Sequence, residues 1–200
     1  GWNANYVLFN TFGGGIQIIS MMLFYPLFRK FISAMQVFYV SFVMAIGGYA
    51  VLLALMFTNH TNIYILMIPG FFIFTAFGML TVLTTVFLAN TVDYGELKNN
   101  RRDESVIFSM QTFVVKLASG VAAMIASICL TISNISNDTS TEAAAMVSDS
   151  YTSVAVLRMT MTVLPIIGLL VAVFIFAKKY ILTDEKLGEI NQELAHRHKA

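Results

Sequence analysis

Five long apolar runs determine what this chain can fold into. They cover residues 6–25, 32–57, 63–89, 106–132 and 153–177, and each contains few charged side chains. A helix rises about 1.5 Å per residue, so about 20 residues cross the hydrocarbon core of a bilayer, and every run reaches that length. The runs are continuous and lack the apolar–polar alternation of a membrane β-barrel strand. The sequence therefore predicts an all-α integral membrane protein, in which residues 178–200 form a tail.

The composition supports this class and excludes several others. Of the 200 residues, 58% are hydrophobic and 12% are charged, which is more apolar surface than one soluble core hides. The single cysteine, Cys129, excludes a disulfide within the chain. No basic patch supports nucleic-acid binding, and no nucleophile motif or metal-ligand spacing supports an enzyme or a metal site. The chain begins with Gly1 and lacks the layout of a signal peptide, so we interpret it as part of a longer protein.

Basic residues occur only on alternate connections between the runs. The connections after the second and fourth runs contain no lysine or arginine. Because basic residues favour the cytoplasmic side, the first run is expected to start outside the cell membrane (the inner membrane), and the C-terminus is expected to be cytoplasmic. The basic residues after the first, third and fifth runs are Arg29, Lys30, Lys98, Arg101, Arg102, Lys178, Lys179, Lys186, Arg197 and Lys199.

The fourth run carries a lysine, Lys116, near its middle. If this helix begins near Glu104, Lys116 lies roughly 18 Å along a core of about 30 Å, too deep for simple snorkelling. Intramembrane charges are costly and usually paired, yet all 11 acidic residues lie in connections, at helix ends or in the tail. We therefore expect the partner carboxylate to come from another part of the full protein. The alternative is a lysine that faces a wet cavity without a function.

Polar residues at helical spacing extend this candidate site. Gln111, Thr112 and Lys116 lie near one face of the fourth run, with Ser119 and Gly120. The possible cavity-lining residues on the first and third runs are Asn10, Gln17, Thr81 and Thr85. For these two runs the alternative, which we favour, is helix packing through small residues such as Gly13, Gly14 and Gly78. We interpret the tail as a helix with charges on most faces and His196 and His198 as a solvated end.

The connection before the fourth run carries an ordered motif. The segment ANTVDYGELKNNRRDESVIFSMQTFVVKLASG resembles the signature of the glycoside–pentoside–hexuronide:cation symporters, the melibiose-permease-like branch of the major facilitator superfamily. That pattern is close to D-x-V-D-Y-G-E-x-K, a short spacer, R-x-E-S, then Q-T and a membrane lysine four residues later. Asn90 stands where the pattern often begins with an acid. The match covers about thirty residues in order, and its spacing makes it specific.

The resemblance implies a fold and a set of roles. The chain would form about the last five helices, all in the C-terminal bundle, of a twelve-helix transporter whose N-terminal bundle and seventh helix are absent from it. The transporter would carry a glycoside or other sugar through the lipid bilayer by alternating access, with Na⁺ or H⁺ as coupling cation and no cofactor. Gln111, Thr112 and Lys116 would approach the sugar and cation sites. The cytoplasmic gate would contain Asp93, Tyr94, Gly95, Glu96, Lys98 and Arg102.

Other interpretations remain open from the sequence. A transporter of this fold can move another amphiphile, such as a lipid, and a membrane assembly subunit that transports nothing would have similar apolar runs. The charged cluster around Asp93 and Arg102 is also compatible with an ordinary solvated loop. Carboxylates at membrane depth in the remainder of the protein would favour the transporter.

Overall fold

The computed structural model describes residues 2–58, 62–132, 151–182 and 184–197, and this part of the chain contains helices and no strand. Five helices are long and apolar enough to cross a membrane, which confirms the predicted all-α membrane fold. The elements are α1 (Trp2–Ile19), a π-helical turn η1 (Ser20–Phe24), α2 (Tyr25–Phe31), α3 (Ala34–Phe57), α4 (Ile63–Asn99), α5 (Glu104–Ile132), α7 (Tyr151–Lys179) and α8 (Asp184–Arg197).

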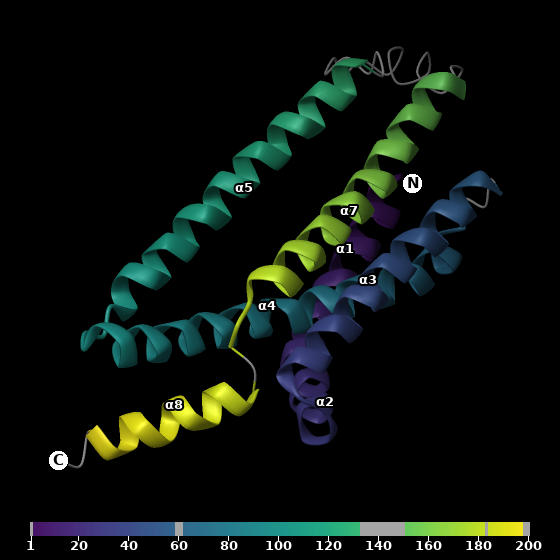
Figure 1. The fold of residues 1–200 in the computed structure, drawn as a ribbon. Coiled ribbons are helices and arrows are strands. Elements are labelled where there is room, and N and C mark those ends of the chain that lie inside the picture. Colours follow the sequence, from purple (N-terminus) through teal and green to yellow (C-terminus); the bar gives the residue numbers. More distant parts are fainter. Residues whose placement is uncertain (1, 59–61, 133–150, 183, 198–200) are drawn as a thin grey trace.

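Helix α4 is the centre of the arrangement (Figure 1). It packs against α1 and α3 and meets α5 and α8, the latter near its C-terminal end, while α7 packs on α3. An aromatic cluster joins α3, α4 and α7: the Phe38 ring lies 4.1 Å from that of Phe176 and 5.6 Å from that of Phe87, centroid to centroid. Buried Met79 and Leu83 of α4 complete this core. Aromatic side chains bury large areas of apolar surface, so this cluster holds α3, α4 and α7 together where they meet.

Local sequence signals set the starts of two helices. Ser33 and Gln36 form a capping box, in which the Ser33 hydroxyl accepts from the Gln36 amide at 3.3 Å and the Gln36 side chain accepts from the Ser33 amide at 2.9 Å. Asn62 caps α4 by accepting from the amide of Tyr64 at 3.0 Å. Both caps satisfy amides that a helix N-terminus leaves without an intrahelical partner.

The first helical span continues past the predicted end at Tyr25. A π-turn at Ser20–Phe24, closed by the Tyr25 amide on the Ser20 carbonyl, leads directly into α2, which ends at Phe31. Proline lacks an amide hydrogen and its ring clashes with the carbonyl four residues earlier. The wider π-turn just before Pro26 lets the helix pass that position without ending. The expected connection PLFRK is therefore the last turns of a helix.

Helix α4 also extends beyond its predicted end at Ala89, through Asn99. The added turns contain Glu96, Leu97 and Lys98, which are good helix formers although the segment is polar. The helix ends where Asn100 adopts a left-handed conformation, with φ 53° and ψ 29°, and its amide donates to the Glu96 carbonyl. Asparagine tolerates this conformation better than most residues. The motif residues 91–99 are thus on a helix, not in a loop.

The tail is a helix, as expected, but the expectation of charges on most faces missed an apolar stripe along it. Helix α8 has an apolar stripe in which Ile190 and Leu194 are buried, and Leu182, just before the helix, is buried with them. This stripe packs on Tyr94 and Leu97 of α4. His196 is exposed, as expected, whereas His198, Lys199 and the Arg197 side chain lie outside the described residues.

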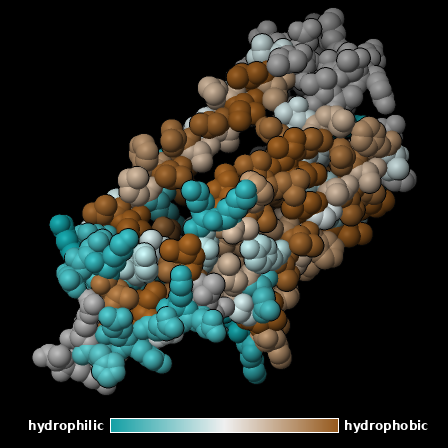
Figure 2. Space-filling model, viewed as in Figure 1, coloured by the Kyte–Doolittle hydropathy of each residue, from teal (hydrophilic) through white to brown (hydrophobic). Residues whose placement is uncertain are grey.

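The surface is polar at one end of the molecule. Figure 2 shows hydrophilic residues gathered around α8 and the junction of α4 and α5, while hydrophobic residues cover α5 and the helices beyond it. The C-terminal ends of α2, α4 and α7, which carry Arg29, Lys98 and Lys178, lie toward this end (Figure 1). These three basic helix ends therefore lie toward the same end of the molecule.

Candidate functional site

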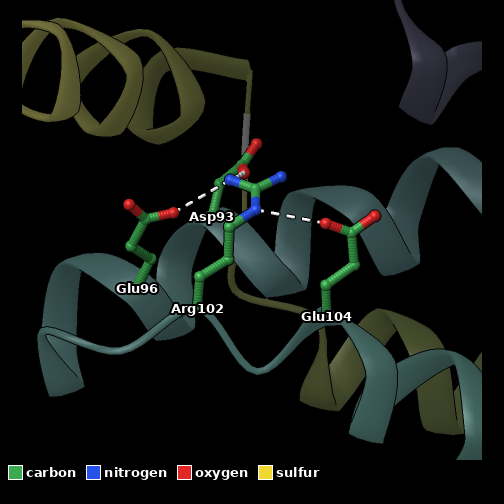
Figure 3. Close-up of polar contacts among 4 residues, drawn as sticks. All are labelled: Asp93, Glu96, Arg102 and Glu104. Atoms are coloured by element: carbon green, nitrogen blue, oxygen red, sulfur yellow. Dashed lines mark hydrogen bonds and ion pairs between the residues drawn. The ribbon is translucent and has the colours of Figure 1, made fainter. Parts of the chain in front are cut away.

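One guanidinium joins three carboxylates where α4 meets α5 (Figure 3). Arg102 Nη1 lies 2.9 Å from Glu96 Oε2 and 3.3 Å from Asp93 Oδ1, and its Nε lies 3.2 Å from Glu104 Oε2. Two of the acids come from the last turns of α4 and the third begins α5. We call Asp93, Glu96, Arg102 and Glu104 the Arg102 cluster. It brings together three of the predicted gate residues.

The local backbone explains how the cluster forms. Asp93 and Glu96 are three residues apart, so they lie on the same face of α4. The left-handed Asn100 ends the helix and turns the chain, so that Arg102 reaches back over that face. Neighbouring Arg101 pairs separately with Asp103, at 2.6 Å.

The electrostatics of the cluster favour the charged guanidinium. Hydrogen bonds to Glu96, and then to Glu104, raise the pKa of Arg102 above its ordinary value. Within these four residues, three carboxyl groups surround one guanidinium. The Arg102 side chain is 50% exposed, so water and salt weaken these pairs. Such exposed ion pairs form and separate at a small cost in free energy.

The remaining residues predicted for the gate lie on other sides of the same turns. Tyr94 is half-buried and packs toward α8, and the Lys98 ammonium lies 6.0 Å from the centre of its ring. A Cβ at Gly95 would meet nothing within 4 Å. The motif therefore presents an acidic face to Arg102 and an aromatic face to the tail.

Lys116 lies in the middle of a helix that the described elements leave largely uncovered. Helix α5 begins at Glu104, as expected, so Lys116 is roughly 18 Å along it. The side chain is exposed, and among residues 2–58, 62–132, 151–182 and 184–197 no acid forms an ion pair with it. Thr112 is also exposed and donates to the Phe108 carbonyl at 3.0 Å, while Gln111 is half-buried.

The polar candidates on α1 and α4 differ in placement from the glycines beside them. Asn10, Thr81 and Thr85 are exposed, and both threonine hydroxyls donate to carbonyls of their own helix. The small residues beside them serve packing. A Cβ at Gly13 would strike the Phe74 ring, and one at Gly78 would lie 2.7 Å from the Gln17 carbonyl oxygen. The α1–α4 interface is thus held by glycines, and the exposed polar residues lie outside it.

Three interactions were missed by the sequence reasoning. Buried Ser20 donates to the Thr75 carbonyl at 2.6 Å and links η1 to α4. Arg158 donates to the Met56 carbonyl at 3.1 Å and so satisfies one of the last carbonyls of α3. No pattern in the sequence signals either contact. The third, the apolar stripe of α8, has a readable signal in the spacing of Leu187, Ile190 and Leu194.

Comparison with known proteins identifies the family. The lactose permease of Lactobacillus delbrueckii subsp. bulgaricus is 31% identical over 197 residues, which are 97% of this chain and 29% of the permease. The raffinose carrier protein of Pediococcus pentosaceus is 28% identical over 90% of this chain and 26% of its own length. An uncharacterized symporter of Bacillus subtilis is 26% identical over 67% of this chain and 28% of its own length.

The chain spans less than a third of the length of these relatives, which are named as permease, carrier and symporter and not as enzymes. The family described as MFS/sugar transport protein matches residues 1–184. This match confirms the resemblance drawn from the motif around Asp93 and Lys116. The chain therefore belongs to the MFS/sugar transport family, as a multi-pass membrane protein of the glycoside–pentoside–hexuronide:cation symporter group.

Proposed function

We propose that this chain is the C-terminal part of a sugar symporter in the cell membrane that couples uptake to Na⁺ or H⁺ by alternating access. The observation that carries the proposal is the family match over residues 1–184, with relatives named for lactose and raffinose. Five membrane-spanning helices and a charged cluster at one end agree with it. The basic helix ends face the cytoplasm in this proposal, which places the C-terminus inside.

In this proposal the Arg102 cluster is part of the cytoplasmic gate. Its acidic side chains attract basic side chains from the other bundle when the transporter is closed to the inside. Because the pairs are half-exposed, opening replaces them with water at a small cost in free energy. The cluster is thus a switching element and not a binding site.

Lys116 has a different role, at the depth of the membrane. Its ammonium pairs with a carboxylate of the remaining bundle, next to the sites of the sugar and the coupling cation. Thr112 and Gln111, one turn earlier on α5, supply hydrogen-bonding groups to the same region. A buried carboxylate that loses its cationic partner has a raised pKa, so it stays protonated and can neither bind Na⁺ nor release H⁺ readily.

The test is ion-driven accumulation by the full-length protein in liposomes, with lactose and raffinose as the first sugars assayed. Lys116→Ala should abolish uphill accumulation under both a Na⁺ and an H⁺ gradient. Lys179→Ala removes the same charge at an exposed helix end and should accumulate sugar like the wild type. Accumulation by Lys116→Ala at wild-type level and equal expression would refute the role of Lys116. Absence of gradient-driven uptake of any sugar by the wild type would refute symport.

A further inference from the structure

The tail helix α8 rests on the same turns of α4 that carry the Arg102 cluster. Leu182, Ile190 and Leu194 are 5%, 5% and 8% exposed, and their contacts include Tyr94 and Leu97. Burial of this degree in a helix of 14 residues indicates a specific docked position and not a solvated tail. In Figure 1 α8 lies beside the C-terminal end of α4.

Two neighbouring faces of one stretch of α4 therefore carry two different contacts. Tyr94 and Leu97 face α8, whereas Asp93 and Glu96 face Arg102. Each pair is three residues apart, and the pairs are offset by one residue, or about 100° around the helix. If these turns of α4 lose their helical conformation, both contacts change at once.

These turns depend on packing for their helical order. Helix α4 has 37 residues, so it is about 55 Å long, while the hydrocarbon core is about 30 Å thick. Its polar C-terminal turns thus extend toward water, where a short helical segment is marginal without tertiary contacts. Exposed ion pairs such as those of Arg102 contribute little, which leaves the apolar contact with α8 as the stronger support.

We propose that α8 is a latch: by packing on Tyr94 and Leu97 it keeps the last turns of α4 helical and so keeps Asp93 and Glu96 within reach of Arg102. When α8 leaves, the turns loosen and the Arg102 cluster disperses. The tail thereby controls the gate from outside the membrane. The ordering of α4 by α8 does not depend on any transport activity, whereas the effect of α8 on sugar exchange rests on the proposed function.

The first experiment measures amide hydrogen exchange in the full-length protein in lipid nanodiscs. The double variant Ile190→Asp/Leu194→Asp should speed exchange of peptides covering residues 90–104 on the order of tenfold or more, because two buried side chains become charged. The matched control Asn191→Asp/Gln192→Asp adds the same charges on the exposed face of α8 and should leave that exchange unchanged.

A second variant lacks the tail helix, because a stop codon after Ile181 deletes all of α8. If residues 90–104 exchange as slowly in this truncated protein as in the wild type, α8 does not order α4 and the inference is overturned. Sugar exchange in liposomes is then measured for the same variants. Faster amide exchange with an unchanged sugar exchange rate would overturn control of the gate. A wild type that transports no sugar would instead refute the proposed function and leave the amide result intact.

Discussion

Alanine at Gly78 tests a close contact of α4 with the end of α1 and with η1. A Cβ at this position would lie 2.7 Å from the Gln17 carbonyl oxygen and 2.7 Å from Ser20 Cβ. Neither atom can rotate away, because one belongs to the backbone and the other is attached to it. Gly14 on α1 gives the control, since a Cβ there would meet nothing within 4 Å.

The expected magnitude follows from a comparison of the two substitutions. Adding a methyl group to a tightly packed site costs about 1–3 kcal/mol. Both changes also replace a helical glycine with alanine and gain about 1 kcal/mol of helix propensity, which cancels in the comparison. Gly78→Ala should therefore unfold more easily than Gly14→Ala by about 1–3 kcal/mol. Gly48→Ala should fall between them, because its nearest contact at 2.7 Å is Ile73 Cγ1, which can change rotamer.

The assay is a titration of the full-length protein from mixed micelles into sodium dodecyl sulfate, with unfolding followed by circular dichroism. The free energies of the variants are compared at the same detergent composition. Equal stability of Gly78→Ala and Gly14→Ala would show that α1 and α4 are farther apart than described, and the reasoning would be refuted.

Three further predictions concern the polar end and the orientation. Arg102→Glu should slow sugar exchange in liposomes far more than it weakens equilibrium sugar binding; lost binding with normal exchange would contradict the gate. Asn100→Ala should destabilise the α4–α5 junction by about 1–2 kcal/mol in the same detergent titration, whereas Asn100→Gly should not, because only glycine escapes the strain of the left-handed conformation. With Cys129 replaced by alanine, Thr58→Cys should react with an impermeant maleimide on intact cells and Asn99→Cys only after permeabilisation; the opposite pattern would reverse the orientation.

The membrane-spanning helices were predictable because a long apolar run has few alternatives to a helix in a bilayer. The ends of the helices that begin at Trp2 and Ile63 were not predictable, since each end depends on a local feature that a hydropathy profile does not show. At Pro26 a π-turn carries the helix onward, and after Ala89 good helix formers continue it to Asn99. Hydropathy averages treat both segments as connections because they are polar or contain proline.

The candidate site was predictable in its residues and not in its geometry. The motif named Asp93, Glu96 and Arg102, and the structure brings them together, yet Glu104 joins them only because Asn100 turns the chain. Lys116 was identified from its depth alone, which needs no tertiary information. The docking of α8 on Tyr94 was not predicted, because the many charges of α8 obscure the spacing of its few apolar residues.

The π-turn at Ser20–Phe24 has a consequence for the alignment of this chain with its relatives. Such a turn holds one residue more than an α-helix would use between the same two points. Deleting one residue there would restore regular helix and rotate all residues before it, Asn10 and Gln17 included, by about 100° relative to α4. Two homologues that differ by this single deletion would therefore present different side chains to α4 from identical N-terminal sequences. Insertions and deletions at residues 20–24 will thus change that interface more than substitutions in α1 do.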